Sequence, residues 1–308
     1  MRKIYFQKPG MAAEERVVLK AGLHTHTTNS DGKFTPEEII EMYKNEGFDV
    51  LTFTDHRRTN KVSEYDGKGM TLISGIELHP VGPRNSPWHI LAVGVPEDFQ
   101  HTHPATGQEA VDRANEAGAA VFCAHPYWCG FTPDEVMTLN NILGIEVYNT
   151  STRYIGKDYN MYCWDACLDA GKEYTAIAVD DIHQKHDLCG AWTMIFAESN
   201  SPADIIKALK QGYFYSTQGP EFTKIAVHDG ILEAEFTTCP AAILVGRGAG
   251  SGAALSIENP DGPGTYSEIS SIKLDLKNCP KGLFRIQLRD AQGRYAWSNP
   301  IRNPYIWV

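Results

Sequence analysis

The feature that most constrains the fold of this chain is a regular alternation of strand-like and helix-like segments over residues 17–212. The helix-like segment 35–47 has a capping threonine, then a proline, and a closing glycine, which are ordinary helix start and stop residues. The predicted strands are 17–23, 49–56, 71–78, 88–95, 120–126, 144–149, 174–180 and 191–198, and the predicted helices are 35–47, 107–119, 132–140, 157–171 and 201–212. This alternation favours a largely parallel α/β fold, a barrel or distorted barrel.

The pattern changes after about residue 220. Helical periodicity ends, and short β-prone runs at 222–228, 241–246, 271–276 and 283–290 are separated by Gly, Pro and Asn turns. Such runs are typical of a small all-β, sandwich-like domain. We therefore predict two domains, an α/β domain at 1–219 and an all-β domain at 220–308.

Charge and cysteine content narrow the class of protein. The formal net charge is -10, and a chain this acidic is a poor candidate for binding nucleic acid, which needs a basic surface. Its 7 cysteines form no C-x-x-C pair, which is typical of reduced thiols. No apolar run reaches the roughly 18 residues of a membrane span, and the N-terminus shows no secretory pattern, so we expect a cytoplasmic protein without a membrane partner.

Histidines and acids recur at the ends of the predicted strands. His24 and His26 directly follow the first strand, and because they are two apart their imidazoles share a face. The other residues of metal-ligand type at such positions are Asp31, His56, Glu77, His89, His125, Asp181 and His183. Imidazoles and carboxylates that are buried together are costly unless a cation organises them. The placement therefore predicts a metal site at the rim of the barrel, where active sites of such folds lie.

Two ligand positions have alternatives. Glu77 and His79 also share a strand face, so His79 can take the place of His89. Cys123 shares a face with His125, although packing is the favoured interpretation of that cysteine.

Other polar residues are interpreted as lying outside the ligand cluster. Asp180 is expected to point away from the face of Asp181. Asp55 is expected to face the opposite side of its strand from the neighbouring histidine and to make a supporting or structural bond. The second H-x-H, at His101 and His103, follows no strand and is predicted to be a loop.

The succession HTHTTNSDGKFTPEE, TDH, GIE, HILAVG, AHP and D-x-H, over roughly residues 20–185, resembles the PHP (polymerase and histidinol phosphatase) family of metal-dependent phosphoesterases. The resemblance implies a distorted (β/α)7 barrel and three divalent metal ions, with Zn, Mn or Fe as candidates. It implies one ion held by His24, His26, Glu77 and Asp181, a second held by Glu77, His89 and His125, and a third held by Asp31, His56 and His183. Segments 201–222 and 295–301 resemble PHP proteins with a C-terminal β domain, a branch that includes a carbamate-ester hydrolase.

The resemblance also implies a reaction. A water activated by the metal ions would hydrolyse a small phosphate ester of the nucleotide or sugar phosphate type, with Glu77, Asp181 and His183 as the catalytic residues. Two alternatives remain open: a carboxylic or carbamic ester hydrolase on the same metal site, and a metal-binding scaffold without catalysis.

Predicted loops at the same rim carry candidate substrate-binding residues, which are Arg57, Arg58, Arg153 and His186. Arginine can bind phosphate through two parallel hydrogen bonds, although a solvated loop charge is the simpler interpretation of each. Three aromatic residues, Trp128, Tyr148 and Tyr154, are expected nearby, where they either stack on a flat group of the substrate or pack in the fold.

Overall fold

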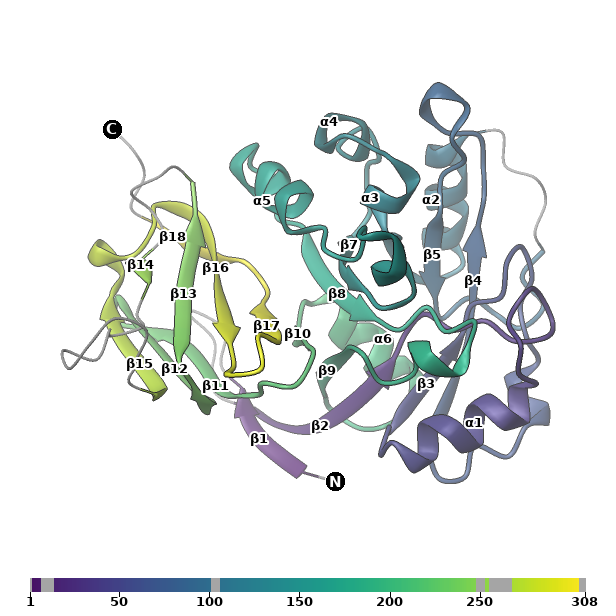
Figure 1. Ribbon diagram of the computed structural model, residues 1–308, viewed down its shortest axis with the longest axis horizontal. Coiled ribbons are helices and arrows are strands. Elements are labelled where there is room, and N and C mark those ends of the chain that lie inside the picture. The colour runs from purple at the N-terminus through teal and green to yellow at the C-terminus, as the bar shows by residue number, and fades with distance from the viewer. Residues whose placement is uncertain (1, 7–13, 101–105, 248–252, 255–267, 305–308) are drawn as a thin grey trace.

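The computed structural model describes residues 2–6, 14–100, 106–247, 253–254 and 268–304. It confirms an N-terminal part of alternating strands and helices and a C-terminal part built of strands, which lie side by side (Figure 1).

The strands of the N-terminal part follow one another in the sheet in chain order. They are β2 (Glu14–Gly22), β3 (Val50–Phe53), β4 (Thr71–Leu78), β5 (Ile90–Val93), β6 (Ala120–Cys123), β7 (Gly144–Asn149) and β8 (Thr175–Val179). An isolated bridge between Thr25 and Ile182, just beyond β2 and β8, joins the first strand of this series to the last. The arrangement is consistent with the distorted barrel that the family resemblance implies.

The expectation of a largely parallel sheet is wrong for β5. This strand runs antiparallel to both β4 and β6, and β9 (Trp192–Ala197) runs antiparallel to β2, whereas the other pairs of the series are parallel. The segment 79–89 between β4 and β5 contains only the 3-10 turn η2 (Pro83–Asn85). Because a parallel connection needs a longer crossover, so short a link returns the chain in the opposite direction.

The helices are α1 (Pro36–Asn45), α2 (Gly107–Glu116), α3 (Pro126–Cys129), α4 (Pro133–Val136), α5 (Met161–Asp169) and α6 (Pro202–Lys210). Four of them, α1, α2, α5 and α6, lie within predicted helical segments, whereas α3 was not predicted. At the start of α1, the Thr35 hydroxyl accepts from the Glu38 amide and the Glu38 carboxylate accepts from the Thr35 amide, which is a complete capping box. The helix predicted at 132–140 is wrong in length, because only its first turn forms.

The C-terminal strands form two antiparallel sheets that share a core. One consists of β11 (Phe222–His228), β12 (Ile231–Cys239) and β15 (Ile269–Asp275); the other contains β13 (Ala241–Gly246), β14 (Ala253–Ala254), β16 (Gly282–Arg289), β17 (Tyr295–Ser298) and β18 (Ile301–Asn303). Alternate residues of β12, such as Leu232 and Ala234, are buried with Leu244 and Ile286 of the other sheet. This confirms the sandwich-like arrangement.

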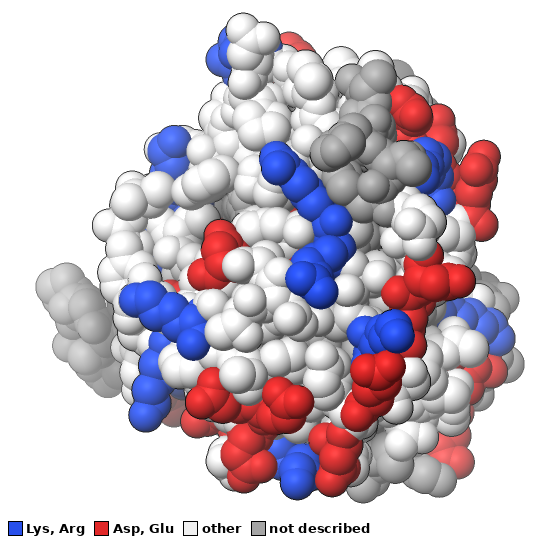
Figure 2. Space-filling model, turned by 90° about the vertical axis from the view of Figure 1, so that its right-hand side faces the viewer, with Lys and Arg blue, Asp and Glu red and all other residues white. Residues whose placement is uncertain are grey.

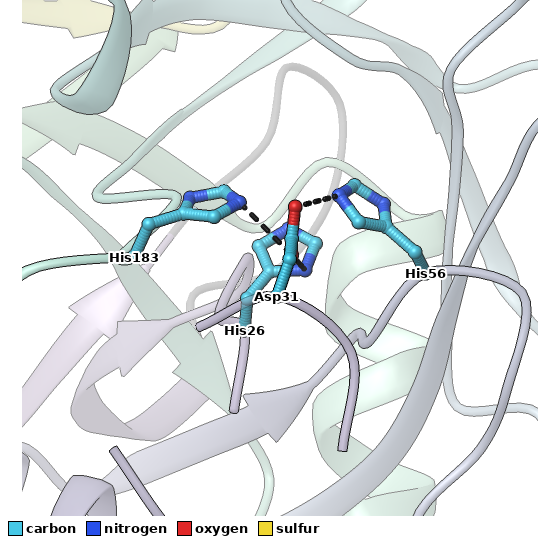
Figure 3. A group of neighbouring side chains, drawn as sticks. All are labelled: His26, Asp31, His56 and His183. Atoms are coloured by element: carbon cyan, nitrogen blue, oxygen red, sulfur yellow. Dashed lines mark ion pairs between the residues drawn. The ribbon is translucent and has the colours of Figure 1, made fainter. Parts of the chain in front are cut away.

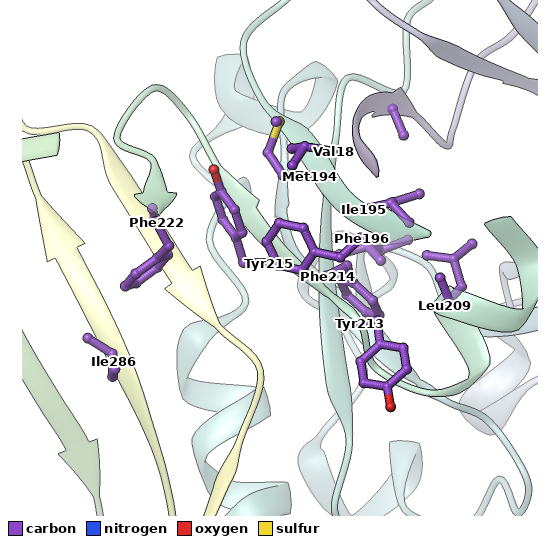
Figure 4. Close-up of a cluster of buried hydrophobic side chains, with 14 of the residues drawn as sticks. Val18, Met194, Ile195, Phe196, Leu209, Tyr213, Phe214, Tyr215, Phe222 and Ile286 are labelled. Atoms are coloured by element: carbon purple, nitrogen blue, oxygen red, sulfur yellow. The ribbon is translucent and has the colours of Figure 1, made fainter. Parts of the chain in front are cut away.

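The two parts of the chain are joined by a continuous sheet. Strand β10 (Phe214–Thr217) pairs with β9 on one side and with β17 on the other, and β1 (Arg2–Phe6) pairs with β2. One apolar core spans the junction (Figure 4), where the Tyr215 and Phe222 rings lie 5.3 Å apart. The domain boundary at residue 219 stays a prediction.

A buried arginine also ties the two parts together. Arg285 of β16 is 1% exposed and donates to both carboxylate oxygens of Asp165 on α5, at 2.9 and 3.0 Å. Its guanidinium also lies 4.9 Å from the Trp164 ring.

The substitution Asp165→Asn would leave the charge of the buried Arg285 uncompensated. We expect the free energy of unfolding to fall by about 2 kcal/mol, a modest value because Asp165 is partly exposed. Urea unfolding measures this loss of free energy, with Asp169→Asn on the same helix as the control. Equal unfolding midpoints for the two variants would contradict a stabilising role of the pair of Asp165 and Arg285.

The surface agrees with the acidic composition. On the face shown in Figure 2, acidic side chains gather over the region of α1, which carries exposed Glu37, Glu38 and Glu41. Lysines and arginines are scattered among them on this face. In the described part of the chain, no helix combines the length and apolar character that crossing a membrane requires.

Candidate metal centre

The structure brings together all the side chains predicted as metal ligands. They are His24, His26, Asp31, His56, Glu77, His89, His125, Asp181 and His183. They come from the ends of β2, β3, β4, β6 and β8 and from the start of β5, as expected from their positions in the sequence. Figure 3 shows four of them, His26 and Asp31 from the loop after β2, His56 from the end of β3 and His183 from the segment after β8, pointing toward one another.

Glu77 lies at the centre of this cluster and is fully buried. Its Oε1 lies 2.7 Å from His89 Nδ1 and 3.2 Å from His125 Nε2. Its Oε2 lies 3.5 Å from the Nε2 atoms of both His24 and His26. Oε2 also lies 2.7 Å from His56 Nδ1. The two oxygens of the carboxylate therefore face different imidazoles, an arrangement suited to bridging two cations.

Asp181 completes the group around the first pair of histidines. Its Oδ1 lies 3.3 Å from His24 Nε2 and 3.0 Å from His26 Nε2, and those two nitrogens are 3.0 Å apart. The backbone of Asp181 has a φ of 51°, in the left-handed region that such residues seldom adopt. Strained backbone of this kind is common at functional sites.

A third group lies nearer to solvent. Asp31, which is 56% exposed, places one carboxylate oxygen 3.3 Å from His56 Nε2 and the other 3.3 Å from His183 Nε2. His183 Nδ1 donates to the Asp181 carbonyl at 2.8 Å, which leaves the lone pair of Nε2 directed at Asp31.

Unpaired buried atoms provide a test of whether these residues fit metal ions. Among the described residues, four of the buried side-chain atoms that make no well-formed hydrogen bond belong to this cluster: His56 Nδ1 and Glu77 Oε2, which lie 2.7 Å apart, His79 Nε2 and Asp181 Oδ1. Buried polar atoms are rarely left unpaired, because each costs free energy. All four atoms belong to this cluster, and nitrogen and oxygen donors of this kind suit divalent transition metals. The residues therefore fit such ions.

The charges of the cluster favour cations. Burial alone would raise the pKa of Glu77, but the surrounding imidazoles, His89 and His24 first among them, hold it well below its usual range. Burial would also raise the pKa of Asp181, but the neighbouring imidazoles, chiefly that of His24, lower it below its usual range. Burial opposes protonation of His24, yet the adjacent carboxylates of Asp181 and Glu146 raise its pKa well above the ordinary value. The carboxylates are therefore ionised although they are buried, because positive charge beside them stabilises the ionised form.

Two supporting residues were not anticipated from the sequence. Glu146 of β7 is fully buried; its Oε1 accepts from His24 Nδ1 at 2.6 Å, and its Oε2 accepts from the His125 amide at 2.8 Å. Asn149 donates to Glu146 Oε2 at 2.9 Å and to Asp181 Oδ2 at 3.1 Å. A carboxylate inside the otherwise apolar strand GIEVYN is the sequence feature from which this role could have been inferred.

His79 and His89 both reach the central carboxylate. His79 Nε2 lies 3.4 Å from Glu77 Oε2, whereas His89 approaches the other oxygen, and the two rings stack at 4.0 Å. Their positions differ, so His79 does not occupy the place beside His125 that was predicted for His89. Which of the two binds a metal ion stays a prediction.

The two cysteines near His125 differ in their surroundings. Cys123 lies in an apolar core, and burial raises the pKa of its thiol, which agrees with a packing role. Cys129, which sequence reasoning did not single out, lies at the end of α3 with Sγ 3.6 Å from His125 Nδ1.

The other polar residues lie as their strand positions predict. Asp180 turns away from the cluster and accepts from the backbone amides of residues 189–191. Asp55 accepts from the Thr27 amide and hydroxyl and from the Ser30 hydroxyl, so it holds the loop that carries Asp31. The pair predicted as a loop, 101 and 103, lies outside the described residues.

A cavity of about 430 Å³ opens onto the cluster. Among the described residues that line it, Lys33 is the one lysine or arginine. The candidate substrate-binding residues Arg57, Arg58, Arg153 and His186 are not among those lining residues. Arg153 bonds to the carbonyls of Thr150 and His186 and to the Tyr154 hydroxyl, and Arg58 donates to the Asn29 carbonyl. Their part in substrate binding stays a prediction.

Comparison with known proteins places this fold and site in a family. The PHP domain model matches residues 22–214, more than half of the chain. The chain belongs to the PHP domain family.

Particular relatives agree with this assignment. The chain is 34% identical over 80 residues to a phosphoribosyl 1,2-cyclic phosphate 1,2-diphosphodiesterase of Eggerthella lenta, a match that covers 24% of this chain and 30% of that enzyme. It is 26% identical over 154 residues to an uncharacterised protein of Methanocaldococcus jannaschii, covering 44% of this chain and 84% of that protein. A two-domain protein of Bacteroides vulgatus, described as containing a predicted PHP-like metal-dependent phosphoesterase, has a similar fold, with a TM-score of 0.53, 17% identity, and coverage of 93% of this chain and 96% of that one.

Proposed function

We propose that this chain hydrolyses a small phosphate ester, of the nucleotide or sugar phosphate type, at the cluster around Glu77. The observation that carries the proposal is the convergence of nine imidazole and carboxylate side chains in one cluster, of which six line one cavity and several buried ligand atoms make no well-formed hydrogen bond within the described residues. The donors form five overlapping groups, enough to hold the three divalent ions, of zinc, manganese or iron, that the family resemblance implies. The name of the Eggerthella lenta relative, a phosphodiesterase, supports the same chemistry.

The side chains divide the work of the reaction. Divalent ions, when bound, lower the pKa of water to about 7 in favourable sites and neutralise charge on phosphoryl oxygens. Glu77 and Asp181 would supply the negative charge that holds the ions, and Asn149 donates to Asp181 Oδ2, which leaves Oδ1 beside His24 and His26. His183 has its Nδ1 committed to a carbonyl, so its Nε2 is held toward the cavity. Lys33 is placed to bind a phosphoryl oxygen.

A second candidate reaction is hydrolysis of a carboxylic or carbamic ester at the same site. The observation that favours it is the small number of cationic side chains in the cavity wall, where Lys33 is the one lysine or arginine among the described residues. A neutral ester needs no such cation.

Elemental analysis and a substrate panel test these proposals. Protein purified without chelator is expected to contain divalent metal, and turnover of phosphomonoesters is expected to stop on chelation and return with added Mn or Zn. Hydrolysis of aryl or carbamic esters alone would replace the phosphoesterase by the second candidate. Metal without turnover of any ester would favour a scaffold, and absence of metal would remove the basis of all three.

A further inference from the structure

The cavity over the cluster has an apolar wall that the metal chemistry does not require. Trp128 and Ile155 both line it, and their side chains are 42% and 61% exposed. Large apolar side chains left open to solvent beside a polar site are typical of ligand contact surfaces. None of the roles proposed for the metal cluster involves Trp128 or Ile155.

Trp128 is held in a fixed position relative to the ligands. Helix α3 begins directly after His125, so Trp128 lies one turn further along the chain, and its amide donates to the His125 carbonyl at 2.9 Å. Its ring packs edge-on against both His125 and His89, with centroids 5.2 Å apart in each case. The indole therefore stands next to the predicted reaction centre, with part of its surface open to the cavity.

Ile155 comes from a different element. It ends the 3-10 turn η3 (Ser151–Ile155), which follows β7, and Ser151 and Thr152 of the same turn also line the cavity. The cavity thus has a polar floor of imidazoles and carboxylates and an apolar wall contributed by two separate segments. Such a division suits a ligand with one charged end and one flat, uncharged end.

We infer that the alcohol portion of the substrate carries a flat aromatic group, which stacks on Trp128 and contacts Ile155 while the ester group lies over the metal cluster. This inference rests on the proposed function for the ester group. A stacking contact on Trp128 favours aromatic esters over sugar phosphates, whether the ring is a simple aryl group or a nucleobase. Lys33 is the one lysine or arginine among the described lining residues, so a substrate with several phosphates matches this cavity less well.

Three phosphomonoesters of primary alcohols test the inference, because their chemical steps are alike: benzyl phosphate, adenosine 5′-monophosphate and glucose 6-phosphate. The holoenzyme is expected to prefer an aromatic ester to glucose 6-phosphate in kcat/KM. Trp128→Ala should lower that preference about tenfold, which corresponds to the loss of one stacking contact. Trp128→Phe should keep the preference within about threefold, and Ile155→Ser should lower it about threefold. The aromatic ester with the larger loss identifies the ring as aryl or nucleobase.

Controls separate stacking from structural support. Tyr162→Ala, an aromatic residue of α5 that is 80% exposed and does not line the cavity, is expected to behave as the wild type. Metal content is measured for every variant. An equal loss for all three substrates, or loss of metal in Trp128→Ala, would overturn the inference, since Trp128 would then act only by packing on His89 and His125.

Failure of the phosphoesterase proposal is distinguishable from failure of this inference. If no phosphomonoester is hydrolysed but carboxylic esters are, the same variants are compared on benzyl acetate and methyl acetate. A preference for benzyl acetate that Trp128→Ala removes would support the aromatic contact on the alternative reaction. No preference for the benzyl ester would overturn it.

Discussion

Glu77→Gln is expected to lower kcat by about a thousandfold and to reduce the bound metal. The substitution keeps the shape of the side chain but removes the charge of a carboxylate whose two oxygens face different imidazoles. An amide offers one oxygen ligand instead of two, so it cannot bridge. Elemental analysis and steady-state kinetics on the same preparation measure both effects.

The control for this variant is Glu41→Gln, which removes the same charge from the exposed face of α1. It is expected to keep wild-type turnover and metal content. Full activity of Glu77→Gln with a full complement of metal would disprove a bridging role for Glu77. Loss of metal with a changed unfolding midpoint would show that the cluster also supports the fold.

Glu146→Gln is expected to weaken metal binding or turnover by about ten- to a hundredfold, although Glu146 is not placed as a ligand. The Glu146 carboxylate accepts a hydrogen bond from His24 Nδ1 at 2.6 Å. This hydrogen bond fixes the tautomer of His24 that carries its proton on Nδ1 and its lone pair on Nε2. A glutamine presents its amide group either to His24 or to the His125 amide, so one of these two contacts loses its acceptor. His24 would then tend to carry its proton on Nε2, the atom that faces Glu77 and Asp181.

Metal titration and the pH profile of turnover separate this positioning role from a purely structural one. A positioning role predicts weaker metal binding and a shift in the pH dependence, partly restored by excess metal. Glu198→Gln, a partly exposed carboxylate after β9, is the matched control. Unaltered metal affinity and pH profile in Glu146→Gln, at wild-type stability, would remove Glu146 from the working site.

The ligand positions could be predicted because they depend on local periodicity. Side chains two apart on a strand share a face, which is why His24 with His26 and Asp181 with His183 point into one site. Strand ends that meet at one edge bring such pairs together whatever the exact path between them. For the same reason Asp180 could be placed outside the cluster from its neighbour alone.

The supporting contacts could not be predicted, because they join residues far apart in the chain. Glu146 reaches His24 across 122 positions, and Arg285 reaches Asp165 across 120. The reversed direction of β5 depends on the length of the connection between β4 and β5. The pairing of β10 with β17 depends on packing between the N-terminal and C-terminal parts of the chain. Loop charges such as Arg153 find nearby carbonyls that a sequence does not reveal.

The amino-acid sequence by itself determined the class of fold and the set of residues able to bind metal, because strand period, helix caps and residue spacing are local properties; the family followed from the resemblance of its motifs. Only the tertiary structure decided which oxygen of Glu77 faces which histidine, that Glu146 holds two of the ligands, and that Trp128 and Lys33 rather than the predicted arginines line the cavity. The physical reason is that a side chain's face follows from its own strand, whereas its partners follow from how distant segments pack.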